Sequence, residues 1–265
     1  MEPVDKWTSG AAYEGWVGRW SRRFADVFLD WLEIPPGKEW LDVCCGSGAL
    51  SEAILERSSP ASVEGVDQSP AQIAYARKHR ARQNAHFQLG DARELPFAPE
   101  SFDVAVCGLG LNFIAEAERA ACEMRRVTRT RGTAAAYVLD YREGARFIRE
   151  FWDVAISVDP EAVVFDQGRR FPLCTPDGLC NLFKAADLEA VEVQPLEIIT
   201  RFPNFDDYWQ PLLSEQGSAP VYLASRDERI QKEICTRLRA TLPCQADGSI
   251  ELPARAWAVR GRIRP

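Results

Sequence analysis

The residues best suited to chemistry lie in one glycine-rich turn and in an acidic position that follows it. The turn is Leu41-Asp42-Val43-Cys44-Cys45-Gly46-Ser47-Gly48, and Asp67 lies 21 residues beyond Gly46, at the end of the strand-like run 62–66. A glycine-rich turn after a strand lets the backbone approach a ligand closely, and an acidic residue about 20 residues later can accept both ribose hydroxyls. The spacing therefore predicts a nucleoside-binding site.

The same turn argues against a dinucleotide. A pyrophosphate-binding turn carries a third glycine three residues after the second, and that position here is Ser51. The acidic Asp42 would also repel a phosphate, whereas it would suit an ammonium group. S-adenosylmethionine (SAM) has a ribose, an adenine and an amino group but no phosphate, so these residues favour SAM as the cofactor.

Two later segments extend the pattern. Asp67-Gln68-Ser69-Pro70 combines a serine cap with a proline in the first turn, which predicts the start of a helix. The segment Gly90-Asp91-Ala92-Arg93 is followed by the apolar run 102–106. In this order the segments resemble class I SAM-dependent methyltransferases of the ubiquinone-biosynthesis type (methyltransferase type 11), over roughly residues 10–140.

The resemblance implies cofactor contacts at defined positions. Asp42 would reach the amino end of the methionine part, often through water, and Asp67 would bind the ribose. The other implied contacts are Gly46, Ser47, Gly48, Gln68 against the adenine, Asp91 and Ala92 at the adenine edge, and Gly108. The family's N-terminal helix lies over SAM, so Tyr13 and Arg19 are expected at the carboxylate end, with plain core and surface roles as the alternative. The spent cofactor would be S-adenosylhomocysteine (SAH).

Three positions depart from the family's pattern. Cys44 stands where glycine is usual, which should reduce the room beside the methionine part. Arg131-Gly132 replaces a proline-glycine turn before the fifth strand and keeps a glycine that can take a positive φ. Asp187 replaces a glycine near the end of a later helix, and aspartate tolerates the left-handed conformation better than most residues do.

The secondary-structure pattern alternates short apolar strands with helical stretches, which is typical of a parallel sheet. Strands are predicted at 40–44, 62–66, 86–88, 102–107 and 133–139, followed by a helix at 177–186 and strands at 190–198 and 254–260. We expect an α/β fold with a Rossmann-like, doubly wound sheet. The family pattern implies seven strands in the order 3-2-1-4-5-7-6, with the last strand antiparallel.

The expected organisation is a single methyltransferase domain over residues 1–265. An N-terminal lid helix is expected at about 10–30, and the core should comprise about 30–140, 176–200 and 253–265. Two excursions, at about 141–175 and 201–252, leave from the edge where ligands bind in open α/β sheets, so they would form a helical cap.

The cap is rich in large rings, namely Phe147, Phe151, Trp152, Phe202, Phe205, Tyr208, Trp209 and Tyr222. Any single ring is expected to belong to a small packed core. As a group, the rings suggest an enclosed, aromatic-lined pocket for a modest organic molecule.

The sequence offers few groups for acid–base catalysis. Methyl transfer depends mainly on alignment and on the exclusion of water, and it needs a base only when the acceptor must lose a proton. The segment 108–113 after the fourth strand contains no histidine. The candidate bases are Asp140 and Tyr141 at the end of the fifth strand and Tyr208 in the cap.

The composition is that of a globular protein, with 46% hydrophobic and 27% charged residues. The net charge of −7 disfavours nucleic acid as a partner, because neutralising phosphates needs a basic face. The eight cysteines include no CxxC pair, so neither a zinc site nor another metal site is predicted. The N-terminus lacks a secretion pattern and no run reaches membrane-spanning length, which predicts a cytoplasmic protein without a membrane partner.

The sequence therefore predicts a SAM-dependent methyltransferase that acts on a small organic molecule. A methyltransferase that acts on RNA or protein is one alternative, and the local basic cluster at 125–131 is its support. A SAM-binding regulatory protein without transferase activity is the other, supported by Cys44 and by the missing histidine.

Overall fold

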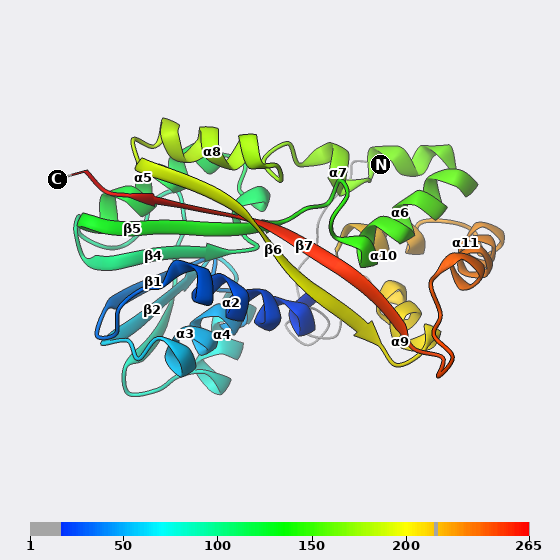
Figure 1. Cartoon of the computed structure of the whole chain (residues 1–265), viewed down its shortest axis with the longest axis horizontal. Helices are drawn as coiled ribbons and strands as arrows, with labels where there is room; N and C mark the ends of the chain where they lie inside the picture. Colours follow the sequence, from blue (N-terminus) through cyan, green and yellow to red (C-terminus); the bar gives the residue numbers. More distant parts are fainter. Residues whose placement is uncertain (1–16, 215–216, 265) are drawn as a thin grey trace. The chain divides into compact units, whose positions relative to one another are not determined.

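The computed structural model describes residues 17–214 and 217–264. Its sheet has seven strands in the order β3-β2-β1-β4-β5-β7-β6, as predicted (Figure 1). The strands are β1 (Glu39–Val43), β2 (Ser62–Asp67), β3 (Ala85–Leu89), β4 (Phe102–Gly108), β5 (Thr128–Leu139), β6 (Glu189–Phe202) and β7 (Ile250–Arg262).

Strands β1 to β5 are parallel, whereas β7 runs against β5. The Arg131 amide donates to the Ile263 carbonyl at 3.1 Å, and the Asp140 amide donates to the Arg255 carbonyl at 3.0 Å. Residue numbers thus rise along β5 while those of its partners fall along β7, which confirms the predicted antiparallel strand.

The described helices include α2 (Arg19–Leu32), α3 (Ala49–Arg57), α4 (Pro70–His79), α5 (Ala117–Val127), α6 (Arg146–Val158), α7 (Gln167–Arg170), α8 (Pro176–Ala185), α9 (Phe205–Trp209), α10 (Ser218–Ala224) and α11 (Glu228–Thr241). Three short 3₁₀ segments, η2 (Leu111–Phe113), η3 (Pro160–Val164) and η4 (Gln210–Leu213), connect them. No helix in the described part of the chain is both long enough and apolar enough to cross a bilayer.

The contacts divide the chain into two compact units. The core unit comprises Ser21–Val138, Leu173–Leu196 and the described part of Ala256–Pro265. The cap unit comprises the described part of Met1–Trp20, with Leu139–Pro172 and Glu197–Arg255. The predicted organisation as one domain with a cap stays a prediction.

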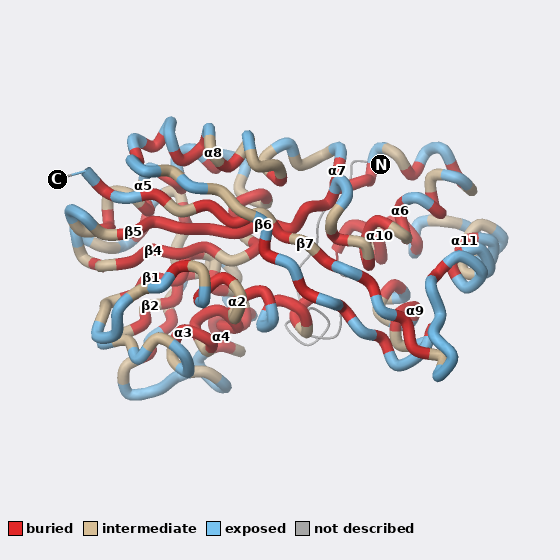
Figure 2. Tube along the Cα trace, viewed as in Figure 1, coloured by how far each residue is buried: buried red, intermediate tan, exposed pale blue. Residues whose placement is uncertain are grey.

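The core unit is built around the buried central strands. Helices α3 and α4 cover one face of the sheet and α5 and α8 the other, while the central strands are buried almost throughout (Figures 1 and 2). Phe24 and Phe28 of α2 pack against Tyr137 of β5, with ring centroids 6.5 and 4.8 Å apart. Burying a ring of this size contributes about 1.5–3 kcal/mol, so these contacts hold the helix on the sheet.

Strand β5 begins at Thr128, five residues before the predicted start. Its pairing with β4 shifts register between Phe102 and Val104. The irregular part of β5 contains Arg129 and Arg131, whose charges interrupt the apolar pattern by which strands were predicted. Gly132 does not use the positive φ that a glycine allows, and Arg131 has that conformation instead (φ 64°). Gly132 is needed for space, since a Cβ there would lie 2.6 Å from the Asp103 carbonyl oxygen. Asp187 is left-handed (φ 63°), as predicted.

The cap unit has its own buried core of rings. Phe147, Phe151, Trp152, Tyr208 and Tyr222 are almost fully buried. Trp152 and Tyr222 lie 5.6 Å apart, and Phe202 and Tyr208 lie 5.2 Å apart, between ring centroids. The rings therefore pack against one another, which is the role that the sequence predicts for each ring taken singly.

Candidate functional site

The candidate site lies at the carboxyl ends of the first four strands of the core unit. Asp42 of β1 pairs in register with Gly65 of β2 and with Val106 of β4. Asp67 of β2 pairs with Leu89 of β3, and the Gly90 amide donates to the Asp67 carbonyl at 3.1 Å. The loops that follow these strands therefore meet at the edge where open α/β sheets bind ligands.

The loop between β1 and α3 is held close to β2. Cys44, Gly46 and Gly48 all take a positive φ, and the Cys45 amide donates to the Val66 carbonyl at 3.0 Å. A Cβ built on Gly46 would meet no atom within 4 Å. The backbone is thus open to a ligand at Gly46, as the glycine-rich pattern predicts.

Asp67 is oriented by the backbone of two loops. Its Oδ2 accepts from the Gly46 amide at 3.0 Å, and its Oδ1 accepts from the Ser69 amide at 2.8 Å. Burial raises the pKa of this carboxyl above its usual value, although these two bonds oppose the shift. Because a carboxylate oxygen can accept more than one hydrogen bond, both oxygens can still receive a sugar hydroxyl.

Asp42 is fully buried and has one oxygen without a partner. Ser51 of α3 donates its hydroxyl to Oδ2 at 2.6 Å, while Oδ1 has no hydrogen bond within the described chain. Burial raises the pKa of Asp42 to about 7. Buried polar atoms nearly always have a partner, so an orphaned oxygen at this edge suits a donor on a ligand, such as an ammonium group.

The predicted adenine contacts lie beyond β3 and β2. Asp91 receives three hydrogen bonds from the Arg93 guanidinium, between 2.7 and 3.1 Å, which lower its pKa to about 2. Ala92 is buried and Gln68 is exposed. The Arg93 pairing was not predicted, and it keeps Asp91 ionised as an acceptor.

Gly108 is confined by packing, and Ser47 is buried. A Cβ on Gly108 would lie 2.8 Å from the Tyr137 hydroxyl, so a larger residue at the end of β4 would have to displace the buried Tyr137 ring. The next amide, Leu109, donates to the Tyr137 carbonyl at 2.8 Å. Ser47 is buried in the loop after β1.

The departure at Cys44 brings two thiols together. Cys44 is hydrogen-bonded to Cys107 of β4, and this contact, together with burial, raises the pKa of the Cys44 thiol well above its usual value. All eight cysteines are free thiols, as predicted. Neutral thiols of this kind are poor nucleophiles.

The candidate bases lie in the cap unit, where they are already hydrogen-bonded. Asp140 accepts from Arg255 Nε at 2.8 Å and Nη2 at 2.7 Å, and from two backbone amides at 3.2 Å. The Tyr208 hydroxyl donates to the Phe147 carbonyl at 3.0 Å, and burial raises its pKa far above the usual value. Tyr141 is buried against Phe171, with ring centroids 5.7 Å apart. These contacts argue against Asp140 and Tyr208 as proton acceptors.

Of the two cofactor contacts predicted for the N-terminal helix, the structure describes only Arg19. Tyr13 lies outside the described residues. Arg19 forms an ion pair with Asp207 at 2.7 Å, and its guanidinium lies over the rings of Trp20 and Phe202 at 4.6 and 5.2 Å. Arg19 therefore has partners within the cap unit.

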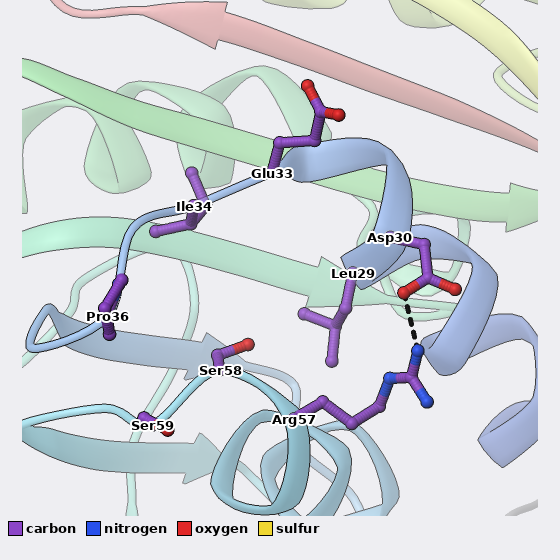
Figure 3. A pocket seen from close by; sticks show the side chains of 8 residues that line it. All are labelled: Leu29, Asp30, Glu33, Ile34, Pro36, Arg57, Ser58 and Ser59. Atoms are coloured by element: carbon purple, nitrogen blue, oxygen red, sulfur yellow. Dashed lines mark hydrogen bonds and ion pairs between the residues drawn. The ribbon is translucent and has the colours of Figure 1, made fainter.

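A shallow pocket of about 540 Å³ lies elsewhere in the core unit (Figure 3). Its lining includes Pro36 before β1, Ser59 before β2 and the ion-paired side chains of Asp30 and Arg57. It lies at the amino ends of the strands, away from the ligand edge, so it has no part in the predicted site. Within the described residues, no group of three or more His, Cys, Asp or Glu side chains is placed to hold a metal ion.

The known proteins that this chain resembles in sequence are methyltransferases. The sequence model of a family described as "Methyltransferase domain" matches residues 41–136. The chain is 32% identical over 186 residues to a 2-phytyl-1,4-naphtoquinone methyltransferase of Thermosynechococcus vestitus, which covers 63% of this chain and 80% of that protein. It is 30% identical over 180 residues to a demethylmenaquinone methyltransferase of Geobacillus stearothermophilus, which covers 62% and 76%. The solved YcgJ protein of Bacillus subtilis shares the fold, with a TM-score of 0.57, 18% identity and coverage of 92% and 99%.

Proposed function

Because the chain belongs to the family of SAM-dependent methyltransferases, we propose that its core unit binds SAM at the carboxyl ends of β1 to β4. The observation that carries this proposal is the Asp67 carboxylate, which the Gly46 and Ser69 amides hold in a fixed orientation at that edge. A carboxylate fixed in this way matches the two hydroxyls of a ribose.

The other residues fit SAM better than a phosphate-bearing nucleotide. The unpartnered oxygen of Asp42 would accept from the ammonium group of the methionine part, and the open face of Gly46 would let the ligand lie against the loop. Asp91 and the Ala92 amide would bind the adenine edge. Two buried or half-buried carboxylates would repel a pyrophosphate.

The residues of the chain act by binding and orientation. When bound, SAM supplies an electrophilic methyl group on its sulfonium. The fixed carboxylates hold the donor so that the acceptor can approach in line, which can supply most of the rate enhancement. We assign no general base, since Asp140 and Tyr208 are held by other groups. The proton that the acceptor loses as it gains the methyl group would pass to water.

We propose that the acceptor is a small, electron-rich ring, such as the reduced (hydroquinone) form of a naphthoquinone. Two relatives are named as methyltransferases of naphthoquinone-type molecules. A methyl acceptor must donate an electron pair, which a hydroquinone ring does and an oxidised quinone does poorly. The net charge of −7 also favours such a molecule over RNA as the acceptor. A cytoplasmic location stays a prediction from the sequence.

Methyl transfer can be measured directly. The full chain would be incubated with SAM labelled in its methyl group and, in separate anaerobic reactions, with 2-alkyl-1,4-dihydroxynaphthalenes, total RNA and a protein extract. We expect label in the organic-soluble naphthalene product alone. The variant Asp67→Asn should lower kcat/KM for SAM by about 10- to 100-fold, because it weakens charge-assisted hydrogen bonds to the ribose.

The matched control is Asp30→Asn, which alters an exposed carboxylate at the opposite edge of the core unit and should leave the rate within about twofold. Label that enters RNA or protein instead would contradict the proposed acceptor. An Asp67→Asn variant with the wild-type kcat/KM would contradict the proposed cofactor site.

A further inference from the structure

Asn112 is a buried amide that has no hydrogen-bond partner. It lies in η2, just after β4, and only 9% of it is exposed. Neither its Nδ2 nor its Oδ1 is hydrogen-bonded to any part of the described chain. Leaving a buried amide unpaired costs stability, so such a group in a ligand-binding region indicates a partner that is not part of the protein.

The turn that carries Asn112 does not need its side chain. The Phe113 amide donates to the Gly110 carbonyl at 3.0 Å, and the Ile114 amide donates to the Leu111 carbonyl at 3.2 Å. The backbone of η2 thus satisfies itself. These backbone bonds do not use the Asn112 side chain, which leaves its amide available to a ligand.

The position of Asn112 in the sheet indicates which ligand it serves. The strand order reverses between β1 and β4, and the proposed SAM contacts Asp42, Asp67 and Asp91 lie at or just beyond the carboxyl ends of the three strands on one side of this point. Asn112 follows β4, the first strand on the other side. Ligands of doubly wound folds occupy the crevice at such a reversal, so a group across it from the SAM contacts is placed for the second substrate.

We propose that Asn112 determines specificity by binding a polar group of the methyl acceptor through its amide N–H and its carbonyl oxygen. The inference rests on the proposed function. An amide is both donor and acceptor and carries no charge, so it matches a neutral group that also gives and receives a hydrogen bond, such as a phenolic hydroxyl. Because an amide cannot take up a proton at neutral pH, Asn112 orients the acceptor and does not act as a base.

Two probes test this proposal, one with two hydroxyls and one in which methyl ethers replace both hydroxyls. They are 1,4-dihydroxynaphthalene and 1,4-dimethoxynaphthalene, titrated anaerobically by calorimetry into the full chain saturated with SAH. We expect the wild type to bind the dihydroxy probe at least about 10-fold more tightly, because a site that hydrogen-bonds a hydroxyl discriminates against its absence. In Asn112→Leu this ratio should fall close to one.

Two further readouts separate binding from a structural role. The affinity of Asn112→Leu for SAH should stay within about twofold, and its Tm should be unchanged or higher, because an unpaired buried amide is removed. The matched control is Asn84→Leu. Asn84 donates to the Pro60 carbonyl at 3.3 Å, so this variant should lower the Tm and leave the probe ratio unchanged.

An unchanged probe ratio in Asn112→Leu, or a fall in its SAH affinity, would overturn the assignment of Asn112 to the acceptor. A wild type that binds no SAH would instead refute the proposed function. If neither probe binds the wild type, a crystal structure of the SAH complex decides. The proposal is supported if the Asn112 amide faces the SAH sulfur and is hydrogen-bonded neither to SAH nor to the protein. It is overturned if the amide is hydrogen-bonded to SAH or to the protein.

Discussion

Two carboxylates of the candidate site differ in how the protein holds them. Asp67 is half-buried and receives two backbone hydrogen bonds, whereas Asp42 is fully buried and is hydrogen-bonded only by Ser51 within the described chain. Asp42 is therefore the group whose charge is most strongly opposed by its surroundings, and its pKa rises to about 7. This difference makes Asp42 responsive to pH near neutrality.

Binding of SAH should be linked to the ionisation of Asp42. The ammonium group that we propose as its partner would need the carboxylate form, and below pH 7 most of the free protein carries a proton on this group. That proton must leave when SAH binds, so the affinity should weaken as the pH falls, approaching about tenfold per pH unit below 7. Calorimetric titration with SAH between pH 5.5 and 8.5 measures this slope.

The variant Asp42→Asn provides the reference for this slope, because an amide does not titrate. We expect the variant to bind SAH weakly at every pH and to lack the loss of affinity below pH 7. A wild type whose affinity follows the same curve as the variant would show that Asp42 does not meet the ligand.

At the scale of elements, the strands were predictable wherever burial made them apolar. The runs before Asp42 and Asp67 gave β1 and β2 almost to the residue. The start of β5 was missed because Arg129 and Arg131 are charged, and because they lie where the pairing of β5 with β4 shifts its register. A side chain that pairs with another element leaves no periodic signal, and for this reason the contact of Ser51 with Asp42 could not be predicted. Arg93 pairs within its own loop and Asn112 has no partner in the described chain, so neither is marked by a pattern in the sequence.

The cap unit is held by a buried ion pair between two of its elements. Arg149 of α6 donates at 2.9 Å to Asp166, which is the N-cap residue of helix α7. The two side chains are 8% and 4% exposed. The same guanidinium also contacts Asp153, which is 55% exposed. The strength of the two contacts should therefore differ with burial.

The variant Asp166→Asn should destabilise the cap unit by about 3 kcal/mol, because it leaves the Arg149 charge buried without its main partner. The variant Asp153→Asn removes the exposed partner of the same arginine and should cost less than about 1 kcal/mol. Hydrogen exchange of residues 146–170, measured by mass spectrometry, reports both changes. Equal protection in the two variants would show that burial does not set the strength of these contacts.

At the scale of the whole molecule, the topology followed from the alternation of strands and helices together with the family resemblance. The strand order and the antiparallel β7 were both predicted and are confirmed. The catalytic candidates were less predictable, because the partners of Asp140 and Tyr208 come from segments far away in the sequence, at Arg255 and Phe147. The sequence alone therefore does not show that other groups already hold Asp140 and Tyr208.

The central claim is that the core unit binds the ribose of SAM through the Asp67 carboxylate. Calorimetric titration of SAH into the wild type, Asp67→Ala and Asp103→Ala tests it most directly. Asp103 is a half-buried carboxylate at the amino end of β4, so its removal is the matched control. We predict at least about 30-fold weaker binding for Asp67→Ala, from the loss of about 2 kcal/mol or more, and a change within about twofold for Asp103→Ala. Wild-type affinity in Asp67→Ala, or no binding of SAH to the wild type, would contradict the account.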